Sequence, residues 1–116
     1  MTLTLTLPLP HRCLSPNART HWGKKASLTK AARHRARLTV LEELQGRAAP
    51  AFTTYSLEFF HSIRRARDDD NAAASCKAYR DGIAEALGVD DSSLSHRATT
   101  LSLDPINPRL EITLHP

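Results

Sequence analysis

Arg64-Arg65-Ala66-Arg67-Asp68-Asp69-Asp70-Asn71 is the stretch around which this chain is organised. A predicted strand enters it, a predicted helix leaves it, and a second acidic pair, Asp90-Asp91, follows that helix. Two carboxylates about 5 Å apart repel each other by roughly 3 kcal/mol at an effective dielectric constant near 20. Such a cluster needs a counter-ion, either the neighbouring arginines or a bound cation. A salt-bridged surface and a metal site are therefore the two alternatives for this stretch.

The strand that enters this stretch is predicted over residues 53–63. Tyr55, Leu57 and Phe59 alternate with polar residues, and Phe60 adds an apolar contact on the second face. This pattern predicts a central strand that is covered on both sides. Carboxylates that follow directly from such a strand would be rigidly mounted, as a metal site requires.

The helix that leaves the stretch is predicted to begin at Asp70 or Asn71 and to end at about Leu87, before Gly88. In one continuous helix, Lys77 lies on the face of Asp70, about 10 Å along the axis. Its side chain leans back toward the carboxylates. The alternative is an exposed lysine that pairs with Asp81 one turn further on. The predicted inner stripe of this helix is Ala72, Cys76, Tyr79, Ile83 and Leu87.

The first residues predict a strand followed by a basic loop. Residues 2–8 alternate Leu and Thr, which is typical of a half-buried strand, and Pro8 and Pro10 end it. Residues 11–27 predict a long polar loop in which one aromatic ring, Trp22, is surrounded by cationic side chains. That ring either anchors the loop to the core or offers a surface on which a nucleobase stacks. The surrounding side chains are Arg12, Arg19, His21, Lys24 and Lys25.

A helix is predicted over residues 28–45, with Ser27 as its N-cap and Gly46 at its end. Lys30, Arg33 and Arg37 recur at spacings of three and four, so they share a face. That face suits a phosphate backbone, and a plain solvated face is the alternative. The apolar stripe consists of Leu28, Ala32, Ala36, Val40 and Leu44, with help from Leu41.

The last third of the chain predicts a loop over residues 89–94 and two strands, over residues 97–103 and 109–114, joined by a turn at 104–108. The complete order is β-α-β-α-β-β. We therefore expect a small α+β fold, a single domain over residues 1–116, in which two helices pack on a mixed sheet.

Charge is distributed unevenly along the chain. Lys and Arg recur from Arg12 to Arg37, whereas the first acidic residue is Glu42, and the net charge is +4. A basic surface beside an acidic pocket suits an enzyme that acts on a phosphodiester. An ordinary basic protein with a solvated face is the alternative. The basic residues expected to contact nucleic acid are Arg19, Lys24, Lys25, Lys30, Arg33, Arg37, Arg64, Arg65 and Arg67.

Several classes of protein are disfavoured by the sequence. Cys13 and Cys76 lie far apart without a CxxC motif, so we expect two buried thiols rather than a disulfide framework or a zinc site. No apolar run is long enough for a membrane span. The first residues lack the basic segment of a signal peptide, so we expect a cytoplasmic protein. An EF-hand is excluded because Ala72 and Ala73 occupy the loop positions that require an oxygen ligand and a glycine.

The acidic residues suit a hard divalent cation. Asp68 and Asp70, two apart on an extended chain, project to the same side, and Asp91 comes from a separate loop. Mg²⁺ prefers such oxygen ligands. A cation held there activates a water molecule and stabilises charge on a scissile phosphate, and Lys77 would neutralise charge in the transition state.

Three segments of the chain together resemble the RusA family of Holliday-junction resolvases, which are frequent in phages and prophages. These are the run from Arg64 to Asn71, Lys77-Ala78-Tyr79-Arg80-Asp81-Gly82-Ile83, and Gly88-Val89-Asp90-Asp91. The family pattern is a basic run, Asp-x-Asp-Asn, a helix with a lysine and an Asp-Gly-Leu-like step, and then Asp-Asp. Ser15-Pro16-Asn17-Ala18-Arg19 also resembles the loop after the family's opening strand.

The resemblance implies a small α+β homodimer that binds branched DNA and nicks opposing strands of a four-way junction during recombination and repair. The implied cofactor is Mg²⁺, with Mn²⁺ as an alternative. Asp68, Asp70 and Asp91 match the family's three carboxylates, and Asp90 stands beside them as a further metal ligand. Lys77 matches the family's catalytic lysine when the helix start is allowed extra residues.

Two other functions remain open. One is a catalytically inactive relative that grips branched DNA, with a purely structural acidic cluster. The other is a nuclease that acts on other DNA forms, such as flaps or linear duplex.

Overall fold

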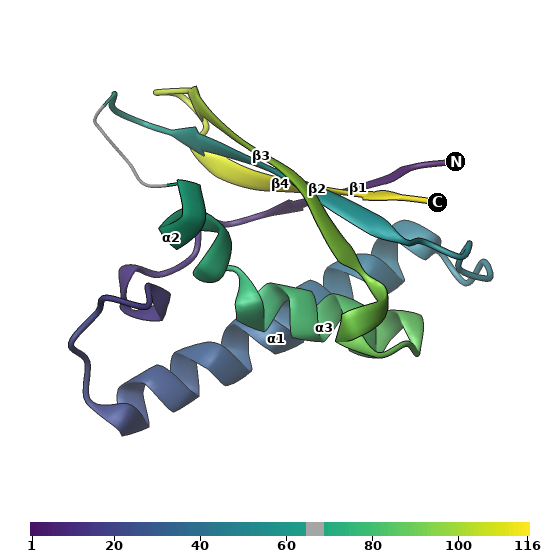
Figure 1. Cartoon of the computed structure of the whole chain (residues 1–116), viewed down its shortest axis with the longest axis horizontal. Helices are drawn as coiled ribbons and strands as arrows, with labels where there is room; N and C mark the ends of the chain where they lie inside the picture. The colour runs from purple at the N-terminus through teal and green to yellow at the C-terminus, as the bar shows by residue number, and fades with distance from the viewer. Residues whose placement is uncertain (65–68) are drawn as a thin grey trace.

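A four-stranded mixed sheet forms the base of the fold (Figure 1). In this computed structural model, which describes residues 1–64 and 69–116, the strand order is β1-β4-β2-β3. β2 pairs with β3 in parallel and with β4 in antiparallel orientation, and β1 pairs antiparallel with β4. The predicted α+β fold with a mixed sheet is thus confirmed. The strands are β1 (Leu3–Leu7), β2 (Thr54–His61), β3 (Ser95–Leu103) and β4 (Arg109–His115).

The helices cover one face of this sheet (Figure 1). β2 is central, as predicted, but the described helices all lie on one of its two faces. On the second face, the Ser102 hydroxyl donates to Glu58 at 2.8 Å, and the Arg109 guanidinium lies 3.8 Å from the centre of the Phe60 ring. Phe60 is therefore covered by a cation, so the second face of β2 carries polar and charged side chains rather than the apolar contact that we predicted. The buried strand residues that line the core are Leu3, Leu5, Leu7, Tyr55, Leu57, Phe59, Leu110, Ile112 and Leu114.

The long helix α1 (Trp22–Leu44) begins six residues before the predicted start. The Nδ1 atom of His21 accepts a hydrogen bond from the Gly23 backbone N–H at 3.1 Å, so His21 satisfies one of the amide groups that a helix start leaves unpaired. Ser27, the predicted N-cap, lies inside the helix. Gln45 closes the other end in a left-handed conformation.

Only the second half of α1 packs in the core. Ala36, Val40 and Leu44 are buried there, whereas no residue before Ala36 in this helix is buried. A helix of this length extends about 35 Å. Its first turns therefore project beyond the sheet (Figure 1).

The single predicted helix over residues 70–87 is two helices, α2 (Asp69–Ala74) and α3 (Lys77–Leu87). At the break, the Ser75 hydroxyl donates to the Ala72 carbonyl at 2.6 Å, which is the competition with helical hydrogen bonding that serine side chains offer. Lys77 starts a new helix. The helical phase that would place Lys77 above Asp70 is therefore wrong.

Cys13 and Cys76 are both buried free thiols, as expected. Burial raises the pKa of Cys76 to about 12, so its thiol stays protonated and unreactive. Two short 3-10 turns, η1 (Arg12–Leu14) and η2 (Asp91–Ser93), complete the described elements. Among the described helices, none is long and apolar enough to cross a membrane.

Gly82 sets the distance between α1 and α3. A Cβ atom at this position would overlap the carbonyl oxygen of Arg33 and would lie 3.1 Å from the Cβ of Ala36. The two helices can therefore meet backbone to backbone only because residue 82 has no side chain.

We expect Gly82→Ala to lower the free energy of unfolding, because the added methyl group forces the helices apart, a change that typically costs about 1–3 kcal/mol. The direction of the change in the free energy of unfolding is informative, because a glycine-to-alanine replacement at an unobstructed helical position raises stability by up to about 1 kcal/mol. Urea denaturation measures the change. Ala31→Gly at an exposed position of α1 serves as the control for helix propensity alone. A Gly82→Ala variant as stable as the wild type would contradict the close crossing.

Candidate functional site

The predicted metal ligands begin with the acidic run before α2. Asp69 and Asp70 lie in the first turn of α2, and both residues are exposed. Asp68 lies outside the described residues, as do Arg65 and Arg67. The described part of the chain thus provides one of the two expected Asp-x-Asp carboxylates, and it is open to solvent.

The second acidic pair forms the turn η2. The Oδ1 atom of Asp90 accepts a hydrogen bond from the Ser92 backbone N–H at 3.1 Å and so caps this turn. That bond is the main reason why the pKa of the Asp90 carboxyl lies below its usual value, and a hydrogen bond with the Asp91 side chain lowers it further. Asp90 and Asp91 are both exposed. They therefore present neighbouring carboxylate oxygens to solvent.

The whole of α3 separates these two acidic positions. α3 extends about 16 Å, with Asp70 before its start and Asp91 after its end. In Figure 1, α2 and the turn that follows α3 lie at opposite ends of the helical layer. In keeping with this, no three metal-binding side chains gather anywhere in residues 1–64 and 69–116. Asp70 and Asp91 thus lie before and after the α3 helix of one chain.

Lys77 pairs with Asp81, which was the alternative interpretation of this lysine. Its Nζ atom lies 3.3 Å from Oδ2 of Asp81, one turn further along α3. Because two thirds of the Lys77 side chain is exposed, this ion pair contributes little to stability and is readily exchanged for another anion.

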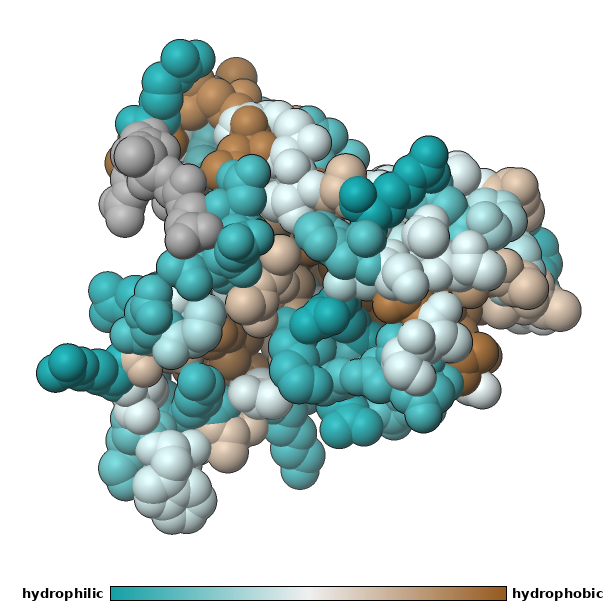
Figure 2. All heavy atoms as spheres, in the orientation of Figure 1, coloured by the Kyte–Doolittle hydropathy of each residue, from teal (hydrophilic) through white to brown (hydrophobic). Residues whose placement is uncertain are grey.

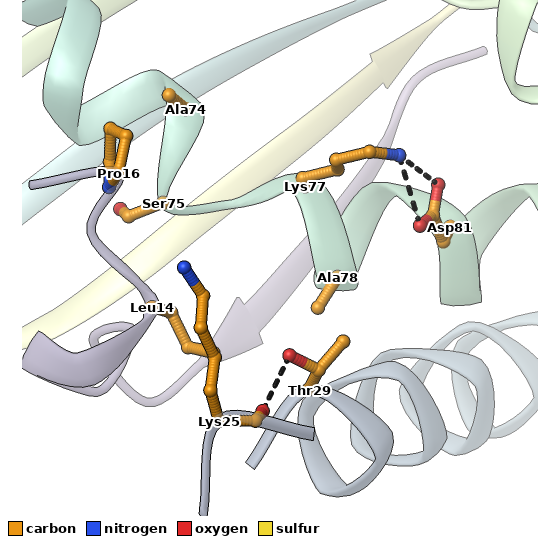
Figure 3. A pocket seen from close by; sticks show the side chains of 9 residues that line it. All are labelled: Leu14, Pro16, Lys25, Thr29, Ala74, Ser75, Lys77, Ala78 and Asp81. Atoms are coloured by element: carbon orange, nitrogen blue, oxygen red, sulfur yellow. Dashed lines mark hydrogen bonds and ion pairs between the residues drawn. The ribbon is translucent and has the colours of Figure 1, made fainter. Parts of the chain in front are cut away.

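A pocket of about 380 Å³ lies between α1, the loop after η1 and the α2–α3 break (Figure 3). It brings together two lysines that are 52 positions apart in sequence. Lys25 points from α1 toward Pro16 and Ser75, whereas Lys77 turns toward Asp81 (Figure 3). The walls also include Leu14, Thr29, Ala74 and Ala78. Two ammonium groups thus flank a mainly apolar hollow beside the helix that carries Asp70.

Basic side chains gather along α1, as the spacing predicted. Lys30, Arg33 and Arg37 line one hollow of about 310 Å³, together with Glu85 of α3. Arg33 Nε lies 2.9 Å and Arg37 Nε 3.6 Å from the Glu85 carboxylate. All of these side chains remain about half exposed. The predicted cationic face exists, and one carboxylate from another helix partly neutralises it.

His34 also lines this hollow. Sequence reasoning did not assign it, although its position four residues after Lys30 indicates the same helix face. The part played by Glu85 had no signal in the sequence, because only the packing of α3 on α1 brings it there.

A second basic hollow, of about 580 Å³, lies at the start of α1. Arg12, Arg19, His21 and Lys24 contribute to it, and none of the described residues that line it is acidic. Trp22, the first residue of α1, is 78% exposed. The interpretation of this residue as an anchor to the core is therefore wrong. Arg64, the remaining described residue of the predicted nucleic-acid set, is exposed at the end of the segment after β2.

The chain is 43% identical over 91 residues to an uncharacterised protein of Xylella fastidiosa (strain Temecula1 / ATCC 700964). The matched stretch covers 76% of this chain and 60% of that protein, so the chain spans less than two thirds of the length of this curated relative. No protein-family model matches the chain.

Proposed function

We propose that this protein is a metal-dependent, structure-selective endodeoxyribonuclease that resolves four-way DNA junctions by paired nicking, as RusA-family enzymes do. The observation that carries the proposal is the pattern Asp68-x-Asp70-Asn71 followed by Asp90-Asp91, together with the exposure of its described carboxylates. The reaction belongs to DNA recombination and repair, in the cytoplasm of a cell that carries the gene in its genome or in a prophage.

The cationic face of α1 supports DNA as the substrate. Lys30, Arg33 and Arg37 follow one side of a helix, and regularly spaced cations of this kind neutralise successive phosphates. Such contacts give affinity without sequence specificity. This is the property expected of an enzyme that selects its substrate by shape.

We infer that two copies of the chain together supply the carboxylates for a hard cation. Asp68 and Asp70 would come from one protomer, and Asp91, with Asp90 beside it, from the partner, since α3 separates Asp70 from Asp91 within a chain. The donor set is oxygen only, which suits Mg²⁺ or Mn²⁺. A cation bound there supplies charge that activates water and stabilises the scissile phosphate. A homodimer with twofold symmetry would carry two such sites, one for each nicked strand.

Lys77 is the proposed partner of the reacting phosphate. Its exposed ion pair with Asp81 can be exchanged for a phosphate at little cost. Lys25 lines the same pocket, so a second ammonium group helps to hold negative charge beside α2. Hydrogen bonds and charges of this kind stabilise the transition state more than the ground state when they are placed where charge develops.

The second candidate function is a module that binds branched DNA without cutting it. It is favoured by one observation, namely that the described residues of a single chain contain no group of three metal-binding side chains. In that case the carboxylates only balance the positive charge of their surroundings.

We expect the protein to nick a synthetic four-way junction symmetrically in the presence of Mg²⁺, and to leave a linear duplex of the same sequence intact. EDTA should abolish nicking, and Asp70→Asn should remove it without loss of junction binding. Gel analysis of end-labelled strands measures the products. Junction binding without nicking in either Mg²⁺ or Mn²⁺ would favour the binding module, and cleavage of duplex or flaps would indicate a less selective nuclease.

A site shared between protomers predicts complementation. Asp70→Asn and Asp91→Asn homodimers should each be inactive, but a mixture unfolded and refolded together should regain nicking, because each heterodimer contains one intact site. Asp68→Asn mixed with Asp70→Asn is the matched control, since both changes affect the same half of the site and every heterodimer site is then damaged. Heterodimers of the first pair that form but do not nick would contradict the shared site.

We expect Glu85→Gln to strengthen DNA binding several-fold at low salt, because it removes the carboxylate that neutralises Arg33 and Arg37. Stability should change by less than about 1 kcal/mol, as for other exposed ion pairs. Fluorescence anisotropy at several salt concentrations measures the affinity. Glu42→Gln removes the same charge near the far end of α1 and should have a smaller effect. Equal effects of the two variants would argue against DNA lying along this face.

A further inference from the structure

Packing in the core does not account for the position of Trp22. Tryptophan is highly buried on average in folded proteins, yet the Trp22 residue is 78% exposed and stands outside the core cluster. It is also the one tryptophan of the chain. Aromatic side chains at protein surfaces are enriched in the cores of binding interfaces.

The ring lies at the projecting end of α1. It stacks on His21, with ring centres 5.6 Å apart and an angle of 30° between the planes. His21 in turn caps the helix through the Gly23 N–H. The indole is therefore oriented by a neighbour that is itself fixed, while most of its surface stays available for a partner.

Basic side chains gather in the hollow at the start of α1, where Trp22 lies, and no acidic residue is among the described residues that line this hollow. The adjoining hollow of about 580 Å³ is lined by Arg12, Arg19 and Lys24, and the first acidic residue in the chain is Glu42. A ligand that fits this arrangement has a flat π-face for the indole and negative charges for the cations. A nucleotide with an unstacked base meets both requirements.

A membrane surface is less suitable for the same residues. Helices that lie on membranes present a continuous apolar face, whereas the exposed residues in the next two turns of α1 include Ser27 and Lys30 beside Ala26 and Ala31. One large ring and two small alanines would bury little surface in lipid.

We propose that Trp22 stacks on an unpaired nucleobase while Arg19 and Lys24 contact the flanking phosphates. The inference rests on the proposed function only in taking DNA as the ligand. On a four-way junction, the bases at the branch point are the ones most easily unstacked. Trp22 would therefore bind at the branch point, and α1 would lie along the phosphate backbone of one arm.

The single tryptophan allows a direct test, because its emission reports on residue 22 alone. We expect oligo(dT) to quench the indole emission and to protect it from acrylamide. An abasic oligonucleotide with the same number of phosphates should bind through the cations without either effect. Equal quenching by both oligonucleotides, or binding of oligo(dT) without quenching, would overturn the stacking.

Affinity provides the second readout. Trp22→Ala should weaken binding of oligo(dT) and of a four-way junction by about 5-fold to 150-fold, the range typical for loss of one stacked base, and Trp22→Phe should restore most of it. Ile106→Ala, at a residue that is 94% exposed in the turn before β4, is the control and should bind like the wild type. Thermal unfolding by circular dichroism verifies that all three variants fold.

The outcomes separate the two proposals. If the wild-type protein binds no DNA, both the proposed function and the stacking proposal are contradicted. If Trp22→Ala binds the junction as tightly as the wild type, the stacking proposal alone is contradicted. Stacking without nicking would support the inference for a protein that binds branched DNA but does not cut it. Emission that shifts with anionic phospholipid vesicles but not with DNA would overturn the inference in favour of a membrane contact.

Discussion

The contact between Gly82 and the backbone of Arg33 is the constraint on which the other features depend. It allows α3 to lie against α1, so that Ile83 and Val40 enter one core above the sheet. The same crossing brings Glu85, one turn further along α3, within 2.9 Å of Arg33. A missing side chain at one position thus sets both the packing of the helical layer and the charge balance of its outer surface.

This packing leaves the first turns of α1 beyond the core and the acidic residues at the two ends of the α2–α3 segment (Figure 1). In Figure 2, hydrophilic side chains cover most of the visible face, and hydrophobic ones are visible mainly between them. Cations on a projecting helix and carboxylates at the ends of another segment suit a protein that grips a polyanion over a wide area. Under the proposed function, a second copy of the chain would supply Asp91 to the metal site.

The strands were predictable because their alternation is local. Leu3, Leu5 and Leu7 point inward with a period of two, and this alternation can be recognised from the local sequence alone. The start of α1 was not predictable from propensity, because His21 caps the helix with an imidazole nitrogen, a role that serine usually takes. At the break after α2, the Ser75 hydroxyl donates to the Ala72 carbonyl, a local contact that helical periodicity does not indicate. The distance between Asp70 and Asp91 depends on that break and on the direction of α3. Spacing in the sequence identifies which carboxylates are candidates, but it does not show whether one chain can bring them together.

The central claim is that carboxylates from two copies of the chain hold a catalytic cation. Crystals grown with Mn²⁺ and a branched oligonucleotide would test it through the anomalous scattering of manganese. The account predicts a manganese peak in contact with Asp68 and Asp70 of one protomer and with Asp91 of its partner. Manganese bound elsewhere, or bound by three carboxylates of one chain, would contradict it.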